Sequence, residues 1–511
     1  MTYRKYFVFL LLLSSFSCTK LDENFRSELA QNNTSDLKAS QFLASAYSSI
    51  AGPFQGNSDL WALQTLSTDE GIPPTRAGDW DDNGAWRAVA TKTWNADLGQ
   101  VRGQFEGLLA AQFAASNVLQ YKPSPQEAAE ARFIRAFSMY WVLDGYDQVP
   151  YREDLNNYKL LPTTLKGKVA IDFIVTELNA ILPTLPDSGP AYVANKNAAK
   201  ALLMKIYLNK GVYLNRSSPT FAPEDMAKVS ALADEIIGSA KYSLNSNYFD
   251  NFSPDNNVKS TENILTIFND PASNRGGNVR GFAFMVSHYN QNPGGWNGFA
   301  TLSDFYDKFD ATDQRRGVYY DYLGALKNPG KRVNVGFMIG QQYNLTTDAP
   351  LNARNPADKP LIFTREVKLR ESDPATLEIT GIRPNKYAFD YATAGDQKNN
   401  DFALFRLADV MLMKAEALLR TSNAAGGLLL VNAIRQKRGA PALASLTLNN
   451  LLDERGRELY WEGYRRQDLI RFNKYLLAYQ EKPATDARTL LFPIPSSQLA
   501  VNPNLTQNPG Y

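Results

Sequence analysis

The chain has 511 residues, of which 44% are hydrophobic and 12% aromatic, and its formal net charge at pH 7 is +2. This composition is typical of a globular protein and excludes an intrinsically disordered chain. The near balance of charge argues against nucleic-acid binding and against electrostatic adhesion to a membrane, since both need a basic surface. The length allows one to about three domains.

The start of the chain has the pattern of an export signal. Arg4 and Lys5 precede a short apolar run, Phe7 to Leu13, and a serine-rich segment then leads to Cys18. The run is too short to span a bilayer, which takes ~20 residues, so we predict a signal peptide over residues 1–17. Its removal leaves 52 basic and 52 acidic side chains.

Cys18 is the only cysteine, so it cannot form an internal disulfide. It directly follows the predicted cleavage site, which is the position of the lipid-modified cysteine of a lipoprotein. Acyl chains anchor a protein by ~0.8 kcal/mol per buried CH₂. We therefore expect Cys18 to be a lipid anchor and residues 18–38 to be a tether. An ordinary secretory signal and a buried helix are the alternatives.

Helical periodicity dominates the chain from Ala39 onward. Ser124 and Glu127 form a capping box with Pro125 at the first helical position, which marks a helix start. A loop region is expected between Gly52 and Asn95. Helices are predicted over 39–50, 98–120, 124–146, 169–181, 195–209, 223–237, 402–421 and 428–438. Paired in sequence, they indicate tetratricopeptide-like hairpins and a mainly α fold, with a helical scaffold over 39–240 and 401–475.

The pattern changes between residues 241 and 400. Short strands are predicted over 263–268, 332–338 and 361–368, and Gly, Asn and Pro punctuate the rest. We predict a mixed insertion of irregular loops and short strands. Loops on a rigid scaffold are where function usually lies; loops that merely cover the core are the alternative.

The last part of the scaffold carries many opposite charges beside apolar residues. They are Glu454, Arg455, Arg457, Glu458, Glu462, Arg465, Arg466, Asp468 and Arg471, on what we predict to be a third helix after those at 402–421 and 428–438. Their spacing is compatible with a solvated face or with a buried lattice of ion pairs, in which every charge needs a partner. The proline-containing segment 476–511 is predicted to cross the scaffold as an extended strap.

Several of these segments resemble one known family. RLADVMLMKAEAL (406–418), ERGRELYWEGYRRQDLIRF (454–472) and the closing LFPIPSSQLAVNPNLTQNPGY are similar to the C-terminal signature of the SusD/RagB family, and EARFIRAFSMYWVLDGYDQVP (130–150) extends the match. The resemblance implies a single SusD-like domain over 39–511. It also implies an outer-membrane lipoprotein that faces the cell exterior, captures nutrients, usually glycans, and passes them to a SusC-like TonB-dependent transporter.

Two clusters of aromatic and polar residues are candidates for the binding site. One is a Gly/Asp/Asn-rich loop containing Trp80, Trp86 and Trp94, and the other lies in the insertion around Trp296. Indole rings on such loops are hard to bury, and exposed apolar groups mark contact surfaces; Trp61, by contrast, is expected in the core. In proteins similar to SusD, ligand residues come from these two regions. The predicted ligand-binding residues are Arg76, Asp79, Trp80, Asn83, Trp86, Trp94, Tyr289, Trp296 and Asn297. Tryptophans that pack as loop anchors are the alternative.

The sequence offers little for catalysis. His288 is the only histidine, so no two-histidine metal site exists, and Ser287 beside it does not make a triad. We predict glycan capture without turnover, no cofactor and no catalytic residue, and a structural Ca²⁺ stays open. Alternatives are a peptide or other nutrient as ligand, a glycosidase using Asp79, Asp81 and Asp82, and a purely structural partner of the transporter.

Overall fold

The computed structural model describes residues 37–511 apart from 154, 156, 158, 274–279 and 394–397. The predicted signal peptide, Cys18 and nearly all of the predicted tether lie outside the described residues. The chain divides into two units, Met1–Lys38 and Ala39–Tyr511, and the fold below is that of the second.

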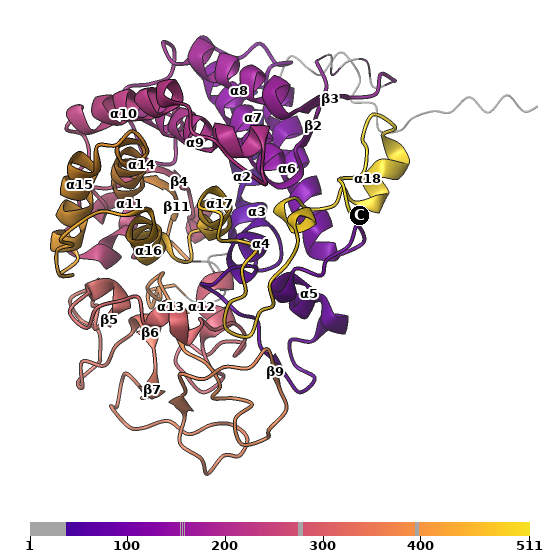
Figure 1. The fold of residues 1–511 in the computed structure, drawn as a ribbon. Helices are drawn as coiled ribbons and strands as arrows, with labels where there is room; N and C mark the ends of the chain where they lie inside the picture. Colours follow the sequence, from indigo (N-terminus) through magenta and orange to yellow (C-terminus); the bar gives the residue numbers. More distant parts are fainter. Residues whose placement is uncertain (1–36, 154, 156, 158, 274–279, 394–397) are drawn as a thin grey trace, which may run out of the picture. The chain divides into compact units, whose positions relative to one another are not determined.

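The scaffold is built mainly from packed helices (Figure 1). They are α2 (Ala39–Ser49), α3 (Ala51–Gln55), α4 (Leu60–Leu66), α5 (Ala85–Thr91), α6 (Gly99–Val118), α7 (Pro125–Tyr146), α8 (Gly167–Ile181), α9 (Lys196–Leu214), α10 (Pro223–Gly238), α14 (Leu407–Arg420), α15 (Ala424–Lys437), α16 (Leu448–Leu459) and α17 (Arg465–Arg471). Sequence neighbours pair, with α6 on α7, α9 on α10 and α14 on α15, and α10 also packs on α14. The predicted mainly α, helical-hairpin scaffold is confirmed, and the α10–α14 contact joins its two halves across the insertion.

Helix α7 shows how local sequence sets these elements. Ser124 caps it, since its Oγ accepts from the Glu127 N–H at 3.3 Å while the Glu127 carboxylate accepts from the Ser124 N–H at 2.8 Å. The predicted capping box is confirmed. From Ala129 to Tyr146 nearly every residue is buried, because α6, α8 and α9 all pack against this helix.

The secondary structure of two segments differs from the prediction. The expected loop between Gly52 and Asn95 contains α3, α4 and α5; all residues of α4 are buried, so the helix has no polar face that would reveal its period. Residues Phe402–Arg406 form strand β11 instead of a helical turn. The strand pairs antiparallel with β4 (Asn263–Ile267) and is buried throughout, and a short buried apolar run does not distinguish strand from helix.

The predicted third helix is two helices. α16 ends at Leu459 and α17 begins at Arg465. Between them Trp461 and Gly463 adopt positive φ angles of 65° and 80°, which an α-helix cannot accommodate.

The insertion is a set of small sheets and short helices. Its strands are β4, β5 (Gly317–Val318), β6 (Val335–Met338), β7 (Gly340–Gln341), β8 (Ile362–Phe363), β9 (Arg370–Glu371) and β10 (Arg383–Asn385), and its helices include α11 (Asn256–Lys259), α12 (Arg280–Val286) and α13 (Ser303–Tyr306). β6 lies between β10 and β5, and β7 pairs with β8. Each of the three predicted strands overlaps an observed one, β4, β6 or β8, and each observed strand is shorter than predicted.

The charges of the C-terminal scaffold form a buried lattice. Glu458 lies 2.9–3.0 Å from Arg315, Arg406 and Arg438, and all four side chains are fully buried. Burial by itself raises the pKa of Glu458, but the three guanidinium groups outweigh it and hold the pKa well below its ordinary value. Of the two interpretations of these charges, the solvated face is therefore excluded and the ion-pair lattice is confirmed.

The segment 476–511 lies along the scaffold and contains a short helical turn, α18 (Ser496–Val501). Near its start, Lys482 donates to the carbonyl oxygen of Leu66 at 2.7 Å. At its end, the Tyr511 hydroxyl accepts from the Trp94 indole at 2.7 Å. These bonds hold the strap against the first helices and the loop that follows them.

Candidate functional site

A strained loop follows strand β1 (Thr75–Arg76), which pairs with β9. Ala77, Trp80, Asp82 and Asn83 have φ angles of 55°, 59°, 43° and 54°. A positive φ is an outlier for a residue as bulky as tryptophan. Such strain costs of order 1–3 kcal/mol per residue and clusters at functional sites. The backbone conformation of this loop, as well as its composition, therefore makes it a candidate functional site.

A second loop, residues 287–298, meets the first. It folds back on α12, with the Trp296 N–H donating to the Phe284 carbonyl at 2.5 Å and the Asn297 N–H donating to the Ser287 carbonyl at 2.8 Å. Gly298 lies directly under the Trp80 ring, and a Cβ there would come within 2.4 Å of that ring. The absence of a side chain at this position lets the indole lie against the second loop.

Trp80 and Trp296 come together at this junction. The Trp80 Nε1 donates to the Trp296 carbonyl at 3.1 Å, and the ring centroids are 6.4 Å apart at an interplanar angle of 48°. Both indoles are half-buried, and they line a shallow, open recess of ≈ 560 Å³. The other residues lining the recess are Asp79, Asp82, Tyr289 and Arg354. The recess therefore combines apolar ring faces with carboxylate, hydroxyl and guanidinium groups.

The charges at the recess are unevenly balanced. Arg354 stacks on the Tyr289 ring at 3.7 Å and lies 3.4 Å from Glu378. The Tyr289 hydroxyl donates to Asp79 at 3.3 Å, and burial, with the Asp79 charge, raises the pKa of Tyr289. Arg354 is thus paired with Glu378, and Asp79 and Asp82 add two exposed carboxylates to the lining, of which Asp79 also interacts with the charge of the buried Arg76.

His288 holds the second loop in place from below. Its Nδ1 accepts from the Asn290 N–H at 3.0 Å, and its Nε2 lies 2.9 Å from Glu378 Oε2. The same carboxylate oxygen accepts from the Arg354 N–H at 2.6 Å. Burial lowers the pKa of His288 to about 4 although Glu378 opposes the shift. The imidazole is therefore neutral at pH 7, with its proton on Nε2, and it links the segments that carry Tyr289 and Arg354.

Several of the predicted ligand residues are buried. Trp86 and Trp94 have only 3% and 1% of their surface exposed, so the prediction that their rings stand in solvent is wrong. Trp86 packs against Phe299 with ring centroids 5.0 Å apart, and Trp94 is bonded to Tyr511. Both rings pack on the inner side of the loop, as expected from the alternative in which the tryptophans are loop anchors. Trp61 is buried in the core as predicted.

Arg76 and Asn297 are also buried, contrary to the role expected for them. The Arg76 guanidinium donates to the carbonyl oxygens of Leu377, Gly298 and Thr380 at 2.6–3.2 Å, and burial lowers its pKa to about 9. Asn297 Oδ1 accepts from Arg383 at 2.9 Å. Arg76 thus joins the start of the first loop to Gly298 of the second, whereas Asn297 ties the second loop to β10.

The remaining predicted residues lie at the surface. Asp79, Trp80, Tyr289 and Trp296 line the recess together, whereas Asn83 is exposed on the same loop without lining it. Sequence reasoning did not assign a binding role to Arg354, because it lies in an irregular segment with no periodic signal. From the sequence, Asp82 is expected as one of the polar groups around the loop tryptophans and as a candidate glycosidase carboxylate, and it is not among the predicted ligand residues.

The side chains considered for the catalytic alternatives contact other groups of the protein. The His288 ring is bonded to Glu378 and not to Ser287. The carboxylates proposed for a glycosidase each have a protein partner: Asp79 accepts from Tyr289, Asp82 accepts from the Trp86 indole at 2.5 Å, and Asp81 pairs with Arg87.

Across the residues that the structure describes, no group of three or more His, Cys, Asp or Glu side chains is placed to hold a metal ion. Among the same residues, none of the helices combines the length and the apolar character needed to cross a membrane.

Comparison with known proteins identifies relatives of this chain. The SusD family model matches residues 232–511, more than half of the sequence. The starch-binding protein SusD of Bacteroides thetaiotaomicron is 28% identical over 422 residues, which cover 76% of this chain and 73% of that protein.

Solved structures agree on the fold. A laminarin-binding SusD-like protein superposes with a TM-score of 0.69 at 19% identity, covering 93% of this chain and 99% of its own. Surface glycan-binding protein A from Bacteroides thetaiotaomicron, in complex with laminarihexaose, gives a TM-score of 0.63 at 18% identity and covers 92% of this chain and 98% of its own.

Proposed function

The chain belongs to the SusD family, and we propose that it is a surface protein that binds a neutral oligosaccharide or polysaccharide at the recess between Trp80 and Trp296. The observation that carries this proposal is the convergence of these two half-buried indoles with Tyr289 and Asp79 on one open surface. An open recess suits a polymer, which must enter and leave sideways, better than a small molecule that a deep pocket would enclose.

The recess has the groups that sugar recognition needs. A pyranose ring presents apolar C–H faces, which lie flat on an aromatic ring, and hydroxyl groups, which need hydrogen-bond partners. The two indoles offer ring faces, and Asp79, Asp82 and Arg354 offer acceptors and donors. The strained loop and the bond from Trp80 to the Trp296 carbonyl fix the platform before the ligand arrives, which lowers the entropic cost of binding.

The charge at the recess selects against acidic sugars. Asp79 and Asp82 lie at the rim, and Arg354 is matched by Glu378. A uronate or sulfate group bound there would lie close to these two exposed carboxylates, and such a like-charge juxtaposition is unfavourable. A neutral glycan meets no such penalty.

The protein's place in uptake follows from its family and its first residues. We propose that Cys18 carries the lipid anchor in the outer membrane, that the domain faces the cell exterior, and that the bound glycan passes to a TonB-dependent transporter of the SusC type. Binding requires no cofactor and no bond cleavage in this account. A peptide ligand is less favoured because peptide sites rely on exposed strand edges, whereas the groups lining the recess are side chains from the two loops and from Arg354.

Calorimetry tests the proposal directly. The detergent-solubilised chain is titrated with maltohexaose and with laminarihexaose, the two probes suggested by the relatives, and Trp296→Ala is titrated in parallel. Binding of at least one probe that disappears in Trp296→Ala supports the proposal. Binding of neither, or binding that Trp296→Ala leaves intact, rejects the recess as the glycan site. Assaying reducing-end release with Asp79, Asp81 and Asp82 substituted separates a binder from a glycosidase.

A further inference from the structure

A second cavity shares two of its segments with the recess. The loop 287–298 contributes Tyr289 and Trp296 to the recess but Gln291 and Asn292 to this cavity. The segment 341–354 contributes Arg354 to the recess and Tyr343 to the cavity. Tyr289 and Gln291 are two positions apart, a span of at most ~7 Å, so the two cavities are neighbours.

Hydrogen bonds tie the two segments together between the cavities. The Asn290 side-chain amide donates to the Asn352 carbonyl at 2.9 Å, and the Gln291 amide donates to Gln342 at 3.2 Å. In the sequence, Asn290 lies between Tyr289, which lines the recess, and Gln291, which lines the cavity. The two cavities are therefore held in a fixed relation by the same wall.

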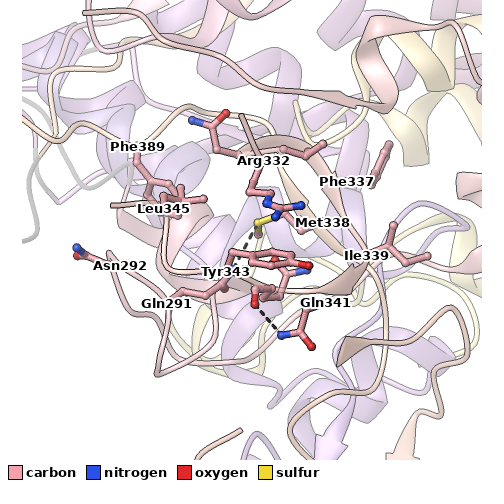
Figure 2. A pocket seen from close by; sticks show the side chains of 13 residues that line it. Gln291, Asn292, Arg332, Phe337, Met338, Ile339, Gln341, Tyr343, Leu345 and Phe389 are labelled. Carbon is pink, nitrogen blue, oxygen red and sulfur yellow. Dashed lines mark hydrogen bonds between the residues drawn. The ribbon is translucent and has the colours of Figure 1, made fainter. Parts of the chain in front are cut away.

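The cavity is about the size of one small ligand unit. Its volume is ≈ 230 Å³, below the ~300–1,000 Å³ of pockets that take drug-sized ligands. Figure 2 shows Arg332 and Tyr343 side by side in its lining, with Asn292 and Gln341 on different sides. Met338, Leu345 and Phe389 add apolar surface. A ring face, apolar groups and amides thus surround a space for a single ring.

The Tyr343 ring is held rigidly. The Arg332 guanidinium lies 3.7 Å from the ring centroid, and that guanidinium is itself fixed by Asp348 at 2.8 Å. Among the described residues that line the cavity, Arg332 alone is charged, and Asp348 balances its charge. The lining is therefore close to neutral, which favours a hydroxyl-bearing ligand over an anion or a cation.

We propose that the cavity around Tyr343 is a second sugar subsite, which holds a further unit of the same neutral glycan chain that the recess binds. This inference rests on the proposed function. The recess at Trp80 and Trp296 binds one part of the chain, the polymer continues along the wall formed by residues 289–292, and a unit beyond it enters the cavity. Asn292 and Tyr343 contact only a chain long enough to reach them.

The experiment is a ladder of chain lengths. The full chain in detergent is titrated with maltose through maltooctaose and with laminaribiose through laminarioctaose, using wild type, Tyr343→Ala, Tyr343→Phe, Asn292→Ala and Trp296→Ala. Tyr343→Ala is expected to weaken the longest bound oligosaccharide by about tenfold and to leave the shortest bound one unchanged. Tyr343→Phe keeps the ring and is expected to behave as wild type.

Asn292→Ala provides a second test of the subsite in case Tyr343→Ala fails to fold. Asn292 is exposed, so its substitution is expected to preserve the fold, which circular dichroism checks, and a length-dependent loss of affinity in this variant supports the subsite independently. If Tyr343→Ala and Asn292→Ala bind every length as wild type does, or lose affinity equally at every length, the subsite is refuted while the recess stands. If Trp296→Ala binds as wild type, or wild type binds neither series, the proposed function falls and the subsite falls with it.

Discussion

The indole N–H of Trp80 donates to the backbone carbonyl of Trp296 although the two residues are 216 positions apart in the chain. One hydrogen bond therefore joins the loop before α5 to the insertion, at the point where the recess opens. The orientation of the Trp80 ring depends on it, because the indole lies on a loop whose own backbone is strained.

Trp80→Phe keeps an aromatic face but removes this bond. A hydrogen bond contributes about 0.5–1.5 kcal/mol net, so glycan affinity should fall by roughly three- to tenfold. Trp94→Phe is the matched control, since it also loses one indole bond, to Tyr511, but lies away from the recess. Isothermal titration of both variants checks the expectation, and an equal loss in the control would contradict it.

Gly298→Ala tests the packing of the two loops. The added methyl would lie 2.4 Å from the Trp80 ring and 2.7 Å from the Met285 carbonyl, so the ring or the loop must move. We expect weaker glycan binding and a shift in tryptophan fluorescence. Gly78→Ala is the control on the first loop, because a Cβ there meets nothing within 4 Å. Unchanged affinity in Gly298→Ala would show that the position of Trp80 is irrelevant to binding.

The ion-pair lattice around Glu458 should govern stability and leave affinity unchanged. Glu458→Gln leaves three buried arginines without their shared carboxylate, and breaking a buried pair costs about 3–5 kcal/mol. Lys168→Gln removes an exposed pair with Asp172 and is expected to cost less than about 1 kcal/mol. Urea unfolding measures both, and similar midpoints for the two variants would refute the structural role of the lattice.

The burial of neutral His288 predicts a pH dependence. Its pKa is about 4 in the folded protein and about 6.5 in an unfolded chain, so the unfolded state binds more protons between these values. The contribution of His288 to stability is therefore complete above about pH 6.5 and declines as the pH falls toward about 4. Glu378 and the nearby Arg354 and Arg383 are the charged groups that act on it.

Urea midpoints at pH 7 and pH 5 test this expectation in wild type and in His288→Gln. Glutamine does not titrate, so the decrease in the midpoint between the two pH values should be smaller in the variant. An identical decrease in both proteins would assign the pH dependence to other groups, such as the carboxylates of the lattice.

Cys18→Ser tests the proposed anchor. Serine cannot form the thioether to the lipid, so the protein should move from the membrane fraction to the soluble fraction while keeping its glycan affinity. Fractionation followed by immunoblotting detects the shift, with Ser17→Ala as a control that keeps the cysteine. Membrane retention of Cys18→Ser would reject lipid attachment at this residue.

Much of the scaffold could be predicted from the sequence, because amphipathic periodicity and capping residues are local signals. Ser124 and Glu127 mark the start of α7 without any knowledge of its neighbours. Segments buried on every side, such as α4 and β11, lack that periodicity and were assigned wrongly. Positive φ angles at Trp461 and Gly463 likewise divide a predicted helix at a point that composition does not reveal.

The site was only partly predictable for a related reason. Composition places Trp80, Trp86 and Trp94 on one polar loop, but the burial of Trp86 and Trp94 involves contacts with Phe299 and Tyr511, hundreds of residues away. The burial of Arg76 likewise depends on backbone carbonyls of the insertion. Arg354 joins the recess through Glu378 and Tyr289, a relation that no local pattern contains.

The most direct test of the account compares a neutral glycan with an acidic one in the same calorimeter. Wild type should bind a neutral hexasaccharide, maltohexaose or laminarihexaose, show no measurable heat with hexagalacturonate, and lose the neutral ligand in Trp296→Ala. Tighter binding of the hexagalacturonate, or neutral binding that persists without the Trp296 indole, would contradict a neutral-glycan site between the two loops.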